Sequence, residues 1–195
     1  MKNIYFIRHG LAQHNTQFKL YGKRAFYNPL YYDTKLIEEG HRQATNLGKS
    51  WNEIRNIDLV LTSPLMRCLQ TTENIFKDID VPIIAIDIIK EFPQGLQTCN
   101  RRSDIDSLKP MFPKIDFSFI EHNEDILWNP QREETLDELN LRIETFNHFL
   151  NGRDEKNIAI VSHSSFIGQY KDKKIALIEN GDTELIHCYP YKINL

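Results

Sequence analysis

Three short apolar runs divide the chain, at residues 4–7, 59–61 and 158–161. Continuous apolar runs of about four residues are typical of strands buried on both faces, as in a parallel sheet covered by helices. Apolar or small residues also recur at steps of three and four over 36–54, 65–76 and 130–150, which predicts helices. The alternation predicts an α/β protein, a three-layer α/β/α sandwich with a mostly parallel central sheet and helices on both faces.

The ends of the third predicted helix carry recognisable signals. Asn129 is suited to cap it, Pro130 to occupy its first position, and Gly152 to follow its end. Between 88 and 128 the periodicity weakens, with prolines and a glycine interspersed, and we expect an excursion over the active site. Near the C-terminal end, Asn180-Gly181 predicts a hairpin turn between two short strands.

The composition limits the classes of partner. The 195 residues, 41% of them hydrophobic, are expected to bury one core, so residues 1–195 are interpreted as a single domain. The 24 basic and 27 acidic residues give a net charge of −3, which offers no overall attraction for nucleic acid or an anionic membrane. Three cysteines without C-x-x-C spacing and no long apolar segment favour a cytoplasmic protein. The oligomeric state stays open.

Residues suited to phosphate chemistry follow each apolar run. Arg8 and His9 follow the first, Arg67 comes shortly after the second, and His163 follows the third. Ligands of such sheets bind beyond the carboxyl ends of the strands, so these four side chains are expected to share one pocket. A histidine there can attack phosphorus, while guanidinium groups and a protonated His163 compensate the charge of the phosphoryl oxygens without a metal or cofactor. Gly10 would let the backbone approach the phosphate closely.

The leaving oxygen also needs a proton, which a carboxylic acid can supply. Glu91, just after the apolar run 83–89, is the candidate. Glu121 and Glu124 are rivals within the same excursion.

The segments that carry these residues are, in chain order, Arg8-His9-Gly10 with Asn15, Ser63-Pro64-Leu65-Met66-Arg67 with Gln70-Thr71, and Val161-Ser162-His163. Together they resemble the histidine phosphatase superfamily, also called the phosphoglycerate mutase-like family. Ser164, in place of an aspartate after the last histidine, resembles the mutase and cofactor-independent phosphatase branch, branch 1. His14-Asn15 and the run from Cys99 to Trp128 resemble the mutase-like proteins of plants and fungi.

The resemblance implies roles for individual residues. His9 would be the phosphorylated nucleophile, and Glu91 the proton donor. The phosphate pocket would comprise Arg8, Arg67 and His163, with Asn15 as an auxiliary contact and Gly10 and Ser164 beside it. Two departures are visible: Leu11-Ala12 stands where many members carry an acidic residue and a hydroxyl, and the region after His163 is short.

We expect a metal-independent phosphatase that hydrolyses small phosphate monoesters through a phosphohistidine. The alternatives are a phosphotransferase of the phosphoglycerate mutase type and a catalytically inactive phosphate-binding protein. Arg101 and Arg102 are either contacts for a second anionic group of the substrate or solvated side chains. His14 either lines the pocket or packs at its mouth, and the remaining histidines, including His187, are interpreted as surface or structural residues.

Overall fold

A mixed sheet organises the protein. The computed structural model describes residues 2–175 and 185–194, and within them five strands pair in the order β3-β2-β4-β1-β5. Neighbours within β3-β2-β4-β1 run parallel, and only β5 on the edge runs antiparallel, against β1. The strands are β1 (Asn3–Arg8), β2 (Leu59–Thr62), β3 (Ile83–Ala85), β4 (Asn157–Ser162) and β5 (Pro190–Asn194).

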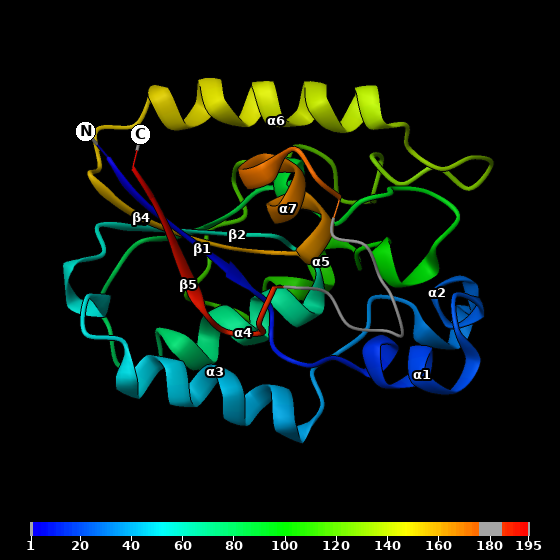
Figure 1. Cartoon of the computed structure of the whole chain (residues 1–195), viewed down its shortest axis with the longest axis horizontal. Coiled ribbons are helices and arrows are strands. Elements are labelled where there is room, and N and C mark those ends of the chain that lie inside the picture. Colours follow the sequence, from blue (N-terminus) through cyan, green and yellow to red (C-terminus); the bar gives the residue numbers. More distant parts are fainter. Residues whose placement is uncertain (1, 176–184, 195) are drawn as a thin grey trace.

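Helices cover both faces of this sheet (Figure 1). The α-helices are α1 (Gln13–Tyr21), α2 (Arg24–Tyr27), α3 (Glu38–Ser50), α4 (Met66–Ile75), α5 (Ile105–Leu108), α6 (Leu136–Asn151) and α7 (Ser164–Asp172). Short 3-10 helices are η1 (Pro29–Tyr31), η2 (Ile54–Asn56), η3 (Asp87–Ile89) and η4 (Thr98–Asn100).

Alternate strand residues supply two hydrophobic cores. Tyr5 and Ile7 pack in the cluster that includes residues of α3 and α4, whereas Ile4 and Phe6 pack in the cluster of α6 and α7. Successive side chains of a strand point to opposite faces, which explains why the continuous apolar runs are buried on both sides. The predicted α/β/α sandwich with a mostly parallel sheet is confirmed. That residues 1–195 form a single domain remains a prediction.

The helix predictions differ in how well their ends were placed. The periodicity over 36–54 and 65–76 corresponds to α3 and α4, whereas α6 begins at Leu136 and not at Pro130. Thr135 is the actual cap, because its hydroxyl accepts from the Glu138 amide while the Glu138 carboxylate accepts from the Thr135 amide. This reciprocal capping box is a stronger start signal than the Asn129-Pro130 pair. The prediction at Asn129 is therefore wrong.

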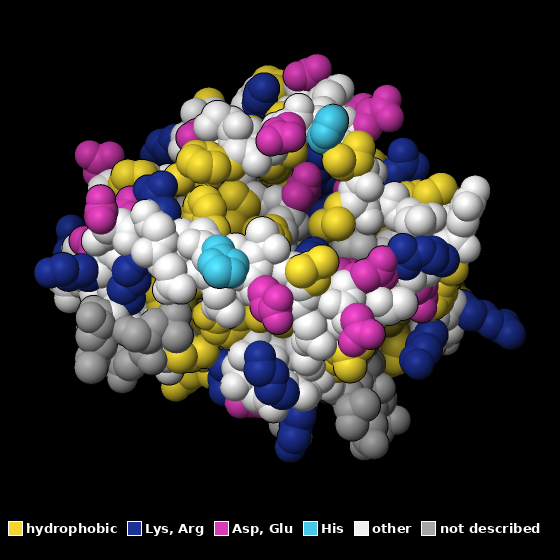
Figure 2. Space-filling view, turned by 90° about the horizontal axis from the view of Figure 1, so that it is seen from above, with side chains coloured by type: hydrophobic (Ala, Val, Ile, Leu, Met, Phe, Trp, Pro, Cys, Tyr) yellow, Lys and Arg dark blue, Asp and Glu magenta, His cyan; other side chains and the backbone are white. Residues whose placement is uncertain are grey.

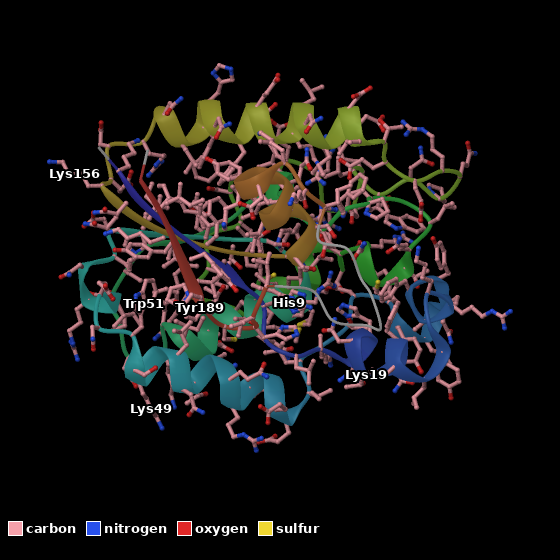
Figure 3. The ribbon with its side chains drawn as sticks, in the orientation of Figure 1. His9, Lys19, Lys49, Trp51, Lys156 and Tyr189 are labelled. Carbon is pink, nitrogen blue, oxygen red and sulfur yellow. The ribbon has the colours of Figure 1, made fainter. Side chains whose placement is uncertain are left out.

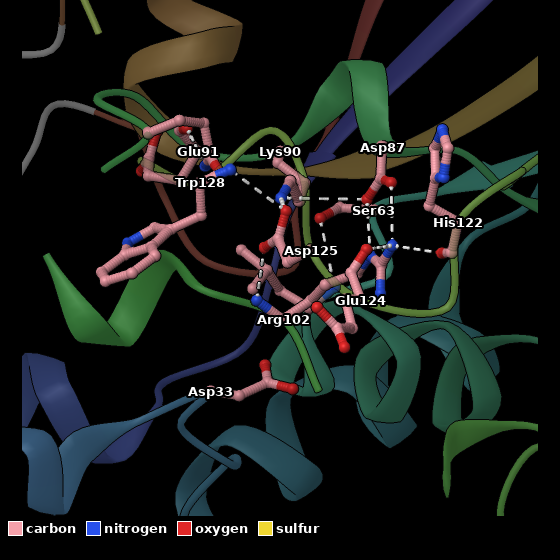
Figure 4. A network of polar contacts seen from close by, with 12 residues as sticks. Asp33, Ser63, Asp87, Lys90, Glu91, Arg102, His122, Glu124, Asp125 and Trp128 are labelled. Atoms are coloured by element: carbon pink, nitrogen blue, oxygen red, sulfur yellow. Dashed lines mark hydrogen bonds and ion pairs between the residues drawn. The ribbon is translucent and has the colours of Figure 1, made fainter. Parts of the chain in front are cut away.

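The connection after β3 is held by a network of buried charges (Figure 4). Lys90 Nζ donates to Asp125 at 2.5 Å, and the Arg102 Nε donates to Asp87 at 2.9 Å. The side chains of Lys90, Arg102 and Asp125 have no exposed surface. Because an unpaired buried charge is costly, these mutual contacts fix the path of the chain on either side of Glu91.

The outer surface is mixed in character. Seen from the side of α6, acidic and basic side chains are interspersed with hydrophobic ones (Figure 2). None of the helices within 2–175 and 185–194 is long and apolar enough to cross a membrane. The predicted turn at Asn180-Gly181 lies outside the described residues.

Candidate active site

A small pocket of about 40 Å³ lies where β1 and β4 end. It brings together side chains from β1, α1, the connection after β3 and the start of α7. Figure 3 shows His9 inside the molecule, whereas Lys19, Lys49 and Lys156 project outward. The lining residues are Arg8, His9, His14, Asn15, Phe18, Phe26, Glu91, Phe92, Gln97, Cys99, Asn100, Ser164 and Ser165.

The His9 imidazole is oriented by the main chain. Its Nδ1–H donates to the carbonyl of Gly10 at 2.8 Å, which leaves Nε2 as the atom with a free electron pair. Burial lowers the pKa of His9 well below its ordinary value, and the positive charge of Arg67 lowers it further. A neutral ring of fixed tautomer is what nucleophilic attack through Nε2 requires.

Three more histidines surround His9. The ring centroids of His163, His187 and His14 lie 5.2, 5.6 and 5.8 Å from that of His9. His163 Nε2 is hydrogen-bonded to Ser63 Oγ at 2.8 Å, and burial, followed by Arg67, lowers the pKa of His163. That a protonated His163 helps to bind the phosphoryl group stays a prediction. A phosphate dianion beside it would raise that pKa.

Two arginines supply positive charge. The Arg67 guanidinium, wholly buried, donates to the Cys99 carbonyl and to Asn100 Oδ1 at 2.7 and 3.0 Å. Its Nε has no hydrogen-bond partner among the residues that the structure describes. Arg8, also buried, donates to the Leu185 carbonyl at 2.7 Å. Such rigidly held guanidinium groups favour an anion between them.

Glu91 faces the first turn of α7. Its carboxylate accepts from the backbone amides of Phe92, Ser165 and Phe166 at 2.8, 3.1 and 3.3 Å. Ser164 Oγ donates to it at 3.3 Å. Burial raises the pKa of Glu91, although the Phe92 amide and Arg67 oppose the rise. A carboxyl group with a raised pKa beside a phosphate pocket is suited to give up a proton. Its rivals, Glu121 and Glu124, are exposed.

The arginine pair of the excursion lies outside the pocket lining. Arg102 is wholly buried and donates to Asp87 and to the carbonyls of His122, Asn123 and Glu124. Arg101 is exposed, with its guanidinium carbon 5.1 Å from the Trp128 ring centroid and 5.7 Å from that of Tyr32. The structure therefore assigns Arg102 to the fold and places Arg101 on the surface.

Asn15 and Ser164 do line the pocket. Asn15 Oδ1 accepts from the amide of Ala12, the residue before α1, whose own side chain has no oxygen to cap the helix. Of the two expectations for His14, the structure has the first: the ring lies in the lining, hydrogen-bonded to Thr34 Oγ1 at 2.6 Å.

Gly10 packs closely against α3, and its approach to the phosphate stays a prediction. Its Cα faces α3, where an added Cβ would lie 2.5 Å from the carbonyl oxygen of Gly40. We expect Gly10→Ala to lower the free energy of unfolding by about 1–3 kcal/mol, because β1 and α3 would have to separate. Urea denaturation measures this. Gly152→Ala is the control, since its nearest atoms would be 3.6 Å away. Equal stability of both variants would contradict the packing role.

Some residues of the site gave no usable signal in the sequence. His187 lies beside His9, and its Nδ1–H donates to the His9 carbonyl at 2.5 Å. Asp33 accepts from the amides of Met66 and Ser103, both at 2.8 Å, and so fastens the start of α4 to the excursion. The apolar pair before His187 is too short to identify a strand end. Within the described residues no cluster of His, Cys, Asp or Glu has the arrangement of a metal site.

This arrangement corresponds to a known family. The model of the histidine phosphatase superfamily, branch 1, matches residues 4–171, and the chain belongs to that superfamily. Phosphoglycerate mutase-like protein 1 of Arabidopsis thaliana is 34% identical over 186 residues, which cover 80% of this chain and 65% of that protein. Phosphoglycerate mutase-like protein 2 of the same plant is 32% identical over 211 residues, 80% and 61% of the two chains. The chain thus spans less than two thirds of either relative. The resemblance predicted from the motifs is confirmed.

Solved structures share the fold. The alpha-ribazole phosphatase from Shigella flexneri superposes with a TM-score of 0.59 and 26% identity, over 85% of this chain and 76% of that one. The ecdysone phosphate phosphatase from Bombix mori has a TM-score of 0.59 over 100% of this chain and 89% of its own. At 17% identity, the second comparison concerns the fold alone.

Proposed function

We propose that this protein is a metal-independent phosphatase that hydrolyses small phosphate monoesters through a phosphohistidine at His9. The observation that carries the proposal is the state of the His9 ring. Its Nδ1–H is bound to the Gly10 carbonyl, so Nε2 of a neutral imidazole is the atom left to attack. Buried Arg8 and Arg67 beside it compensate the charge of the phosphoryl group.

The reaction has two steps. In the first step His9 Nε2 forms a bond to phosphorus while the ester P–O bond breaks. The electron pair of the P–O bond stays on the leaving oxygen, which takes the proton of Glu91. A water molecule then attacks phospho-His9, Glu91 accepts the proton of that water, and the N–P bond breaks to release phosphate and neutral His9. Asn15, Ser164 and His163 border the phosphoryl group, and in this proposal His163 becomes protonated when the dianion binds.

Hydrolysis is favoured over a mutase reaction by the position of the arginine pair. A mutase must hold a phosphoglycerate carboxylate in two orientations, and Arg102 is bound within the fold while Arg101 lies on the surface.

A cytoplasmic location, also proposed, is supported by three buried cysteines, Cys68, Cys99 and Cys188, which carry free thiols.

The first test is release of inorganic phosphate from phenyl phosphate by the purified protein, with and without EDTA. We expect equal rates. When turnover of a substrate with a radiolabelled phosphoryl group is quenched in alkaline detergent, we expect a labelled phosphoryl group on His9 that is stable in alkali and lost in acid. Rates that fall with EDTA would contradict metal independence. Phosphate release without any labelled intermediate would contradict the phosphohistidine. Transfer to phosphoglycerate with little hydrolysis would favour the mutase.

A second test concerns the acid. We expect Glu91→Gln to lower kcat/KM, which reports the first step, by on the order of 10²- to 10³-fold for alkyl phosphates and much less for 4-nitrophenyl phosphate, because nitrophenolate leaves without a proton. The amide oxygen of glutamine can still accept from Phe92 and Ser165, so the fold of α7 is retained. Equal losses on both substrates would assign the proton to another group.

The pH dependence of kcat/KM tests the role of Glu91 as an acid independently. Since burial raises the pKa of Glu91, kcat/KM for an alkyl phosphate should stay high below that pKa and fall as the pH rises through it. The 4-nitrophenyl profile should lack this basic limb.

A further inference from the structure

We propose that the pocket selects monoesters whose organic part is an uncharged aromatic group and discriminates against substrates that carry a second anion. This inference rests on the proposed phosphatase function, since it concerns the group beyond the phosphoryl centre. It follows from what lines the pocket outside the reacting atoms.

One wall of the pocket is aromatic. Phe18 of α1 and Phe26 of α2 stack with ring centroids 5.1 Å apart and planes inclined by 22°. The His14 ring meets the edge of Phe26 at 5.9 Å, and Phe92 lies in the lining next to Glu91. Aromatic rings pack against one another at such distances with a gain beyond the area they bury. The aryl group of an aryl phosphate would pack against these rings as a further member of the cluster.

The same wall lacks positive charge. Among the described lining residues Arg8 is the one Lys or Arg. In the proposed reaction it binds the phosphoryl group together with Arg67, which lies outside the lining. Burial lowers the pKa of His14 well below its ordinary value, so that ring is neutral. A carboxylate or second phosphate on the substrate would be desolvated there without a partner cation, which is costly.

Two polar side chains of the lining, Asn100 and Gln97, already have hydrogen-bond partners. Asn100 Oδ1 accepts from Arg67, and its Nδ2 donates to the Pro93 carbonyl at 3.0 Å. Gln97 Nε2 donates to Glu133 at 3.1 Å. A hydroxyl-rich or carboxylated leaving group would have to displace these contacts, whereas an aromatic one needs none of them.

The test compares phenyl phosphate with 3-carboxyphenyl phosphate, whose phenols have similar acidity. In the unmodified protein we expect kcat/KM to favour phenyl phosphate by about tenfold or more, because the added carboxylate has no partner. Similar values, or a preference for the carboxylated ester, would overturn the inference while leaving the phosphatase proposal intact. Failure to release phosphate from either ester would overturn both.

A pair of variants localises the effect. Phe18→Arg places a guanidinium in the aromatic wall at a partly exposed position, and should reduce the discrimination about fivefold or more, mainly through KM for the carboxylated ester. Phe119→Arg adds the same charge at an exposed ring outside the pocket lining, 47% exposed, and should leave the ratio unchanged. Equal shifts in the two variants would mean that net charge, not the wall, sets the preference.

Discussion

Replacement of His9 by alanine is expected to reduce phosphate release from phenyl phosphate by on the order of 10⁵-fold, to the level left by binding alone. The loss is large because the whole reaction passes through a bond to Nε2 of His9. Among the described residues of the pocket lining, His9 is the histidine whose tautomer a backbone carbonyl fixes, whereas His14 is hydrogen-bonded to the Thr34 hydroxyl. His187 also donates to a carbonyl, but it lies outside the lining.

The measurement is a phosphate-release time course combined with denaturation of both proteins. His148→Ala, on the exposed surface of α6, is the matched control and should keep full activity. An active His9→Ala protein, or one that still forms an acid-labile phosphoprotein during turnover, would refute the proposed nucleophile.

The second large effect concerns Arg67. We expect Arg67→Ala to lower kcat/KM by on the order of 10³-fold, and Arg67→Lys to recover only a small part of it. Two nitrogens of the guanidinium donate to the Cys99 carbonyl and to Asn100 Oδ1, which fixes the plane of the group. Its Nε has no hydrogen-bond partner among the described residues. A lysine ammonium can replace the charge but cannot make these contacts together with one to phosphate.

Steady-state kinetics and competitive inhibition by inorganic phosphate separate the two variants. Inorganic phosphate should bind more weakly to both variants than to the unmodified protein, and most weakly to Arg67→Ala. Arg101→Ala serves as the control, since that guanidinium lies on the surface against Trp128. If loss of Arg101 proved as damaging as loss of Arg67, the phosphate pocket would have to include the excursion's surface.

The sequence predicts the chemistry of strand ends better than the loops around them. Apolar runs ending in Arg8-His9 and in Ser162-His163 place those residues at one edge of the sheet, because parallel strands share that edge. Periodicity likewise finds α3 and α4. The predicted start of α6 is wrong because two capping signals lie six residues apart, and the Thr135/Glu138 capping box is stronger than the Asn129-Pro130 pair.

Roles set by long-range contacts are beyond such reasoning. Arg101 and Arg102 are neighbours in the sequence, yet one is fully buried among carbonyls and the other is exposed, a difference that depends on Asp87 and on the segment 122–124. His187 lies beside His9 because the residues just before β5 pair with the end of β1, and no local sequence pattern predicts that pairing.

The contacts around Glu91 also determine how rigidly this side chain is placed. Arg142 of α6 donates to the carbonyls of Ile88 and Lys90, so the main chain before the acid is held by a helix distant in sequence, while the carboxylate is held by α7. Asp125, which binds Lys90, fixes the far end of the excursion. Glu91 is thus held from two sides, by α6 through the main chain and by α7 through the carboxylate, so the proposed acid is positioned before any substrate binds.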